Sequence, residues 1–107
     1  MHYLITYDKE NYTKLPSVTF SDDGYDVFKI PGGGQTQRKR PDTFSFSFNG
    51  ILPDGTEAII LDPLGKVHFV LFTKTNISNG GMHCGGIVTE TTTPDKNQID
   101  QIFAKNA

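Results

Sequence analysis

The single cysteine of the chain lies in a setting that suits a reactive thiol. Cys84 follows Met82 and His83, and the glycine pairs Gly80-Gly81 and Gly85-Gly86 flank these three residues. A histidine can lower the pKa of a neighbouring thiol, and glycines let a substrate approach the backbone. Met82, His83 and Cys84 are therefore a candidate site, and a thiol-dependent enzyme is one hypothesis.

The expected strand geometry argues against this chemistry. Neighbouring residues of a strand point to opposite faces, so His83 cannot easily activate Cys84. If the preceding hairpin closes symmetrically about residues 76–81, the other candidate base, His68, faces Thr89, about five positions from Cys84. We therefore interpret Cys84 as a small buried apolar side chain. We interpret His68 as a buried, neutral, hydrogen-bonded imidazole, and we expect no catalytic residue.

The histidines and carboxylates give no metal signature. His2, His68 and His83 lack the spacing of metal ligands, and a single cysteine does not suit a zinc site. The acidic segment Ser21–Gly24 matches no calcium loop, and its composition is typical of a tight hairpin turn. The sequence predicts neither a metal nor a cofactor.

A basic, glycine-rich segment is the main candidate for binding. Pro31–Asp42 (PGGGQTQRKRPD) has no apolar anchor and contains three consecutive glycines, so we expect an exposed, flexible loop over residues 31–42. A protruding loop with arginines suits insertion into an acidic cleft of a larger protein. The candidate partner-binding residues are Gln35, Gln37, Arg38, Lys39 and Arg40.

Single-stranded nucleic acid is the alternative partner for this segment. Phe44, Phe46 and Phe48 follow it, and bases can stack on aromatic rings while guanidinium groups contact phosphates. Two observations oppose this hypothesis. The three phenylalanines alternate strictly with polar residues, which is typical of a strand with one buried face. The net charge of −2 does not favour an anionic partner.

The surrounding pattern predicts a sheet that supports these segments. Lys66–Thr75 is apolar on both alternating faces, which indicates a central strand covered on both sides. Thr43–Asn49, Glu57–Leu61, Lys66–Thr75 and Met82–Thr92 are separated by short turns, which favours an antiparallel meander. Further strands are expected over residues 2–8, 17–20 and 25–30.

A helix is expected at the end of the chain, over residues 94–105. Thr93 is placed as its N-cap and Pro94 at its first position. Ile99, Ile102 and Phe103 form one apolar stripe, so the helix should dock on the sheet.

These elements predict one mainly β domain of 107 residues. We expect an antiparallel sandwich or half-open barrel of about seven strands with one short C-terminal helix; a closed barrel and an α+β layer are the alternatives. One cysteine excludes an internal disulfide, and no signal peptide or apolar membrane span is recognisable. We expect a cytoplasmic protein with no membrane partner.

The end of the chain resembles one known family. Gly86-Ile87-Val88-Thr89-Glu90, then Thr93-Pro94 and the amphipathic helix, resemble the last strand and helix of profilins, which would imply actin binding. Profilins begin with a helix, whereas this chain begins with a strand pattern. The residues themselves favour a non-catalytic protein-binding module, such as a small inhibitor or accessory protein acting through the Gly/Arg-rich segment.

Overall fold

The structure is a computed structural model that describes residues 2–8, 10–22, 24–48, 53–78 and 81–106; of residues 48, 74–78, 81 and 82 it describes the backbone alone. Nine strands and one helix lie within these ranges. In chain order they are β1 (Tyr3–Thr6), β2 (Thr13–Leu15), β3 (Thr19–Ser21), β4 (Tyr25–Lys29), β5 (Gln35–Lys39), β6 (Thr43–Phe48), β7 (Glu57–Leu61), β8 (Val67–Ser78), β9 (Gly81–Thr92) and α1 (Lys96–Lys105).

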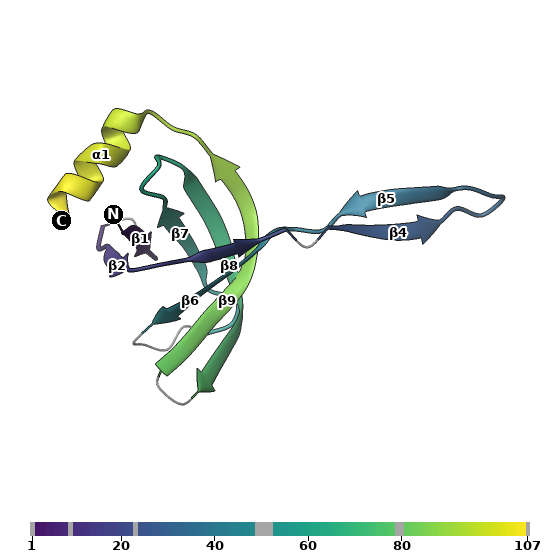
Figure 1. The fold of residues 1–107 in the computed structure, drawn as a ribbon, viewed down its shortest axis with the longest axis horizontal. Coiled ribbons are helices and arrows are strands. Elements are labelled where there is room, and N and C mark those ends of the chain that lie inside the picture. Colours follow the sequence, from purple (N-terminus) through teal and green to yellow (C-terminus); the bar gives the residue numbers. More distant parts are fainter. Residues whose placement is uncertain (1, 9, 23, 49–52, 79–80, 107) are drawn as a thin grey trace.

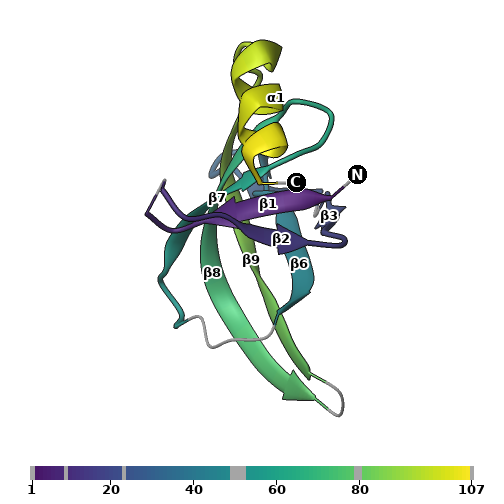
Figure 2. The ribbon, with the colours of Figure 1, turned by 90° about the vertical axis from the view of Figure 1, so that its left-hand side faces the viewer.

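Seven strands form one antiparallel sheet in the order β2-β1-β7-β8-β9-β6-β3, curled into a half-open barrel (Figures 1 and 2). The prediction of a mainly β, half-open barrel with a short C-terminal helix is confirmed. The predicted four-strand meander is wrong at its first step, because β6 pairs with β9 and not with β7. Alternation shows which face of β6 is buried, but it carries no information on which strand lies beside it.

The inward face of the curled sheet holds the larger core. Phe72 is 0 % exposed, and its ring meets the rings of Phe44 and Phe46 edge-on, with centroids 5.3 and 5.9 Å apart. Such edge-to-face pairs add to the free energy gained from burial alone. The remaining buried members of this cluster are Ile5, Leu15, Val18, Ala58, Ile60, Val70 and Cys84.

The outward face is covered in part by α1. Leu4, Leu61 and Val67 pack against Ile99 of the helix, which confirms that the helix docks on the sheet. The predicted start at Pro94 and the predicted Thr93 cap are wrong, because the N-cap is Asp95. Its carboxylate accepts a hydrogen bond from the amide of Asn97 at 2.9 Å, and the helix begins at Lys96.

The hairpin of β8 and β9 is longer than predicted. The expected turn over residues 76–81 is wrong in extent, because β8 runs to Ser78 and β9 starts at Gly81; residues 79 and 80 lie outside the described ranges. His68 pairs with Thr91 instead of Thr89, because the hairpin closes about one residue later in the chain than expected, with Ser78 opposite Gly81. The irregularities at Phe69/Val70 and Phe72/Lys74 shift the register in opposite directions and cancel before His68. Bulges of this kind leave no signal in an alternating pattern.

β4 and β5 form a separate two-stranded sheet, and the hairpin that contains them, residues 25–40, projects from the half-barrel as an arm (Figure 1). The expected flexible loop over residues 31–42 is therefore wrong in part: residues 35–39 are exposed but form a strand. Gly32, Gly33 and Gly34 close the tip with φ values of 95°, 114° and 91°. Only glycine adopts three such angles readily, so the glycine run is a turn.

The arm continues the register of the sheet below it. Thr19 pairs with Ser45 at the base and Tyr25 with Lys39 in the arm, so the two residue numbers of each pair add up to 64. The amide of Arg40 donates to the carbonyl of Gly24 at 2.8 Å, in the same register. The predicted hairpin turn over residues 21–24 is therefore wrong: Ser21 pairs with Thr43 in the sheet, and Gly24 accepts from Arg40 at the start of the arm. Asp23 lies outside the described ranges. The arm therefore extends the β3–β6 pair in the same register, although its two strands form a separate sheet.

Candidate functional site

The arm exposes large apolar side chains. Tyr25, Val27, Phe28 and Ile30 are 58 %, 55 %, 48 % and 47 % exposed. Among the described residues, no third strand pairs with β4 or β5. An isolated two-stranded hairpin is marginally stable in water, and clustered exposed apolar residues mark interaction surfaces. The arm is therefore the part of the described chain best suited to contact a partner.

The alternation of the strands gives the arm two different faces. Asp26 pairs with Arg38 and Phe28 with Thr36, so Phe28, Ile30 and Arg38 share one face. Tyr25 and Val27 lie on the other face, opposite Lys39 and Gln37. Both faces thus combine apolar and cationic groups.

Two of the five predicted partner-binding residues are engaged at the base of the arm. The ammonium of Lys39 lies 3.3 Å from Asp22 and 3.1 Å from Asp42, and these hydrogen bonds raise the pKa of Lys39. Nε of Arg40 donates to Asp26 at 2.6 Å. All these groups are exposed, so each pair contributes little to stability. Lys39 and Arg40 are therefore already paired at the junction between arm and sheet.

The other three predicted residues, Gln35, Gln37 and Arg38, are exposed along β5. Arg38 makes no hydrogen bond or ion pair with any residue that the structure describes. An unpaired guanidinium presents several donors in a fixed plane, which suits a carboxylate. Arg38 is the available cation of the arm.

The second predicted site does not form a catalytic arrangement. Cys84 is 1 % exposed, and burial raises the pKa of its thiol. The side chain of His83 is exposed and its Nδ1 lies 3.3 Å from the hydroxyl of Ser47. Met82 pairs through its backbone with Phe48 and Ile77, and its side chain lies outside the described set. A buried thiol of raised pKa is a poor nucleophile.

One contact of His68 was missed by the sequence analysis. His68 is 8 % exposed, and its Nδ1 lies 3.1 Å from the hydroxyl of Thr91. Its Nε2 lies 3.5 Å from Asp62 in the turn between β7 and β8, without a hydrogen bond to any described residue. Burial lowers the pKa of His68, while Asp62 opposes this effect. The prediction that the imidazole of His68 is buried is confirmed. The contact with Asp62 could not be inferred from the positions of the two residues in the sequence.

The buried setting of His68 argues for a structural role. The ring of Phe20 lies against the imidazole with centroids 4.4 Å apart. Four surface hollows among the described residues are lined by side chains other than His68. No group of three potential metal ligands occurs within the described ranges.

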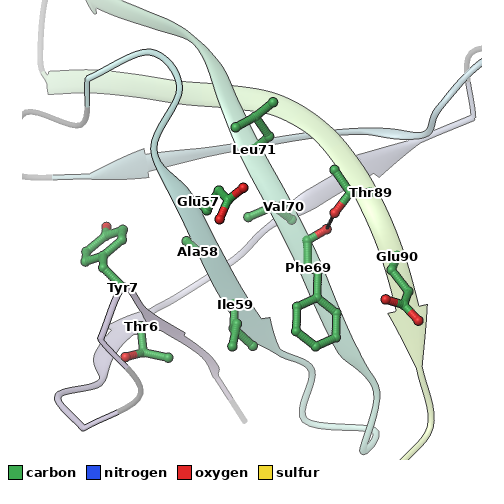
Figure 3. A pocket seen from close by; sticks show the side chains of 10 residues that line it. All are labelled: Thr6, Tyr7, Glu57, Ala58, Ile59, Phe69, Val70, Leu71, Thr89 and Glu90. Carbon is green, nitrogen blue, oxygen red and sulfur yellow. Dashed lines mark hydrogen bonds between the residues drawn. The ribbon is translucent and has the colours of Figure 1, made fainter.

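A groove of about 440 Å³ lies on the outward face of β7, β8 and β9, beside the end of β1 (Figure 3). Its floor carries Ile59, Phe69 and Leu71, and Glu57 on β7 and Glu90 on β9 lie on either side of β8. Burial raises the pKa of Tyr7 to about 12, so its phenol stays a hydrogen-bond donor at neutral pH. The remaining lining residues are Thr6, Ala58, Val70 and Thr89.

Comparisons with protein-family models, curated proteins and solved structures found no match. No helix within the described residues is long and apolar enough to cross a membrane. The functional argument therefore depends on the chain's own surfaces: the arm and the acidic groove.

Proposed function

We propose that this protein is a non-catalytic protein-binding module that acts through its arm, as a small accessory or inhibitory protein. The observation that carries the proposal is the exposure of Tyr25, Val27, Phe28 and Ile30 on a hairpin that no other described element covers. Aromatic side chains next to an arginine are the usual anchors of protein interfaces. The thiol of Cys84 plays no part in this function.

The charge of the arm indicates the chemistry of the partner. Residues 25–40 carry four basic residues and one acidic residue, a net charge of +3. The remainder of the chain carries six basic and eleven acidic residues, a net charge of −5, in agreement with the total of −2. A cationic, partly apolar arm favours an acidic surface with an apolar floor. We place this interaction in the cytoplasm, where a free thiol such as Cys84 persists.

The test replaces residues 27–37 by Asn-Gly. This variant keeps the Asp26–Arg38 pair and closes it with a two-residue turn. We expect urea unfolding as in the natural chain, because the core lies in the half-barrel, and loss of the proteins that the natural chain captures from its host's lysate. Leu64→Ser, which alters an exposed apolar residue far from the arm, is the matched control. Unchanged capture by the shortened variant contradicts the proposal.

Single-stranded nucleic acid is a second candidate partner, but the aromatic side chains that would stack on its bases differ from those that the sequence suggested. Phe44 and Phe46 are buried and cannot stack on bases, but Tyr25 and Phe28 are exposed on the same arm as Arg38. Stacking and phosphate contacts would then come from the arm itself. Fluorescence anisotropy with labelled oligonucleotides at low salt tests this candidate. Equal binding by the natural chain and by Arg38→Ala/Lys39→Ala/Arg40→Ala removes it.

A further inference from the structure

We infer that the acidic partner of the arm is a second copy of this chain: the arm of one molecule lies in the groove on β7, β8 and β9 of the next. This inference rests on the proposed function and specifies its partner. The structure supports it through three observations: the chemistry of the groove, the chemistry of one arm face, and the direction in which the arm points.

The groove is an open strip of the outward sheet face, next to the part that α1 covers. Two rows of paired residues cross it. One row contains Ile59, Phe69 and Glu90, and the next contains Glu57 and Leu71. Ile59, Phe69 and Leu71 are all incompletely buried. The groove thus leaves apolar surface in contact with water.

The two carboxylates of the groove lack cations within the described part of the chain. Glu57 and Glu90 are exposed and form none of the ion pairs among the described residues. Figure 3 places Glu57 on β7 and Glu90 on β9, with Phe69 and Leu71 of β8 between the two strands. A ligand for this groove needs apolar groups along its middle and a cation that reaches a carboxylate at the side.

One face of the arm meets both requirements. Phe28 and Ile30 supply half-exposed apolar side chains, and Arg38 supplies an available guanidinium on the same face. Arg38 lies diagonally across the hairpin from Phe28, because it pairs with Asp26. Apolar groups of the arm can therefore contact Phe69 and Leu71 while Arg38 reaches Glu57 or Glu90.

The arm points away from the groove of its own molecule. It follows β3 and β6 in the same register, and Figure 1 shows it on the side of the half-barrel away from β1 and β7, where one end of the groove lies. A second copy places a body with a net charge of −5 against an arm with a net charge of +3.

The contact joins two different surfaces, the arm of one molecule and the groove of another. Two molecules that exchange arms reciprocally form a closed dimer, whereas one-way exchange continues into a larger ring or a linear array. In both cases each contact contains one arm and one groove.

Two variants test the contact. Phe28→Ser/Arg38→Ser damages the arm and leaves the groove intact; Glu57→Lys/Glu90→Lys damages the groove and leaves the arm intact. Sedimentation velocity over a concentration series should show assembly of the natural chain. Each variant alone should associate at least about tenfold more weakly. An equimolar mixture should give a 1:1 complex, because it contains one intact arm–groove pair.

The controls are an exposed apolar and an exposed acidic residue outside both surfaces. Leu64→Ser and Asp100→Lys should assemble as the natural chain does, and circular dichroism should show that every variant folds. A natural chain that stays monomeric at all concentrations overturns the inference. A mixture that forms no 1:1 complex, or an arm variant that assembles normally, overturns it too.

These outcomes can be separated from failure of the proposed function. A monomeric chain whose arm still captures another protein refutes self-assembly and leaves the binding module standing. If the chain keeps all its interactions, including self-association, after residues 27–37 are replaced, both the self-assembly and the binding function of the arm are refuted. The mixture experiment is thus specific to the partner, and the replacement experiment is specific to the arm.

Discussion

Replacing Phe72 or Phe28 by alanine tests whether stability depends on the half-barrel core and partner binding on the arm. The substitution of Phe72 should mainly lower stability, and the substitution of Phe28 should mainly weaken binding. Phe72 is fully buried between Phe44 and Phe46, whereas Phe28 is half-exposed on the arm. Burial of a phenylalanine contributes about 1.5–3 kcal/mol, and each edge-to-face pair adds roughly 0.5–1.5 kcal/mol. Phe72→Ala should therefore lower the free energy of unfolding by about 3–5 kcal/mol, in the range of cavity-forming substitutions.

Phe28→Ala should cost less than about 1.5 kcal/mol, since only half of its side chain is withdrawn from water. A domain of this size has a total stability of about 5–15 kcal/mol, so both variants should remain folded in dilute buffer. Urea unfolding measures the difference: the midpoint should fall strongly for Phe72→Ala and slightly for Phe28→Ala, at similar slopes. Partner binding should show the reverse, with loss for Phe28→Ala alone.

The reasoning is refuted if the two substitutions destabilise the protein equally. Equal costs would mean that the arm is packed as tightly as the core, and the exposed apolar surface would then have no free area to offer. A cost below about 1 kcal/mol for Phe72→Ala would equally contradict the description of the inward cluster as the main core.

Three further predictions concern the close packing of β8 on β9, the buried histidine of β8 and the N-cap of α1. Gly86→Ala should lower stability by about 1–3 kcal/mol or more in urea unfolding, because a Cβ would lie closer than 3.0 Å to the backbone of Leu71 and Thr73; no loss would contradict the close packing of β8 on β9. Stability should fall as the pH drops below 6.5, the usual pKa of histidine, because the unfolded chain takes up a proton that buried His68 resists. His68→Gln should therefore narrow its stability gap to the natural chain on acidification, as measured by urea unfolding at several pH values; a constant gap argues against a depressed pKa of His68. Asp95→Ala should cost about 1 kcal/mol through loss of the helix cap, measurable by thermal unfolding, while Thr93→Ala, at the position first expected to cap the helix, should be close to neutral.

The alternation of apolar and polar residues was enough to predict which side chains are buried where one face of a strand packs on the core. Phe44 and Phe46 alternate with serines, and both are buried as the alternation requires. Lys66–Thr75 was correctly placed in the middle of the sheet because both of its faces are apolar, and the structure covers it with the inner core on one side and partly with α1 on the other. Burial that follows from a repeating pattern can be deduced from the sequence alone.

The arm could not be deduced in this way. Gln35–Lys39 is polar on both faces, so it lacks the alternation that identifies a strand, and the glycines before it suggest mobility. Its strand character comes from backbone pairing with β4, which side-chain patterns do not record. The acidic groove was missed for a related reason: Glu57 and Glu90 are far apart in sequence and are brought near one another by the pairing of β7, β8 and β9.

The unbroken register of the long hairpin makes the reach of the arm adjustable without any change to the half-barrel. An antiparallel strand rises about 3.4 Å per residue, so removing two residues from each of β4 and β5 would shorten the arm by about 7 Å and preserve which side chains share a face. Removing one residue from each would shorten it by about 3.4 Å and turn the distal side chains over to the opposite face. Changes of two residues per strand therefore alter the length of the arm and keep its two faces, so the length of the hairpin can set the distance between the half-barrel and a partner.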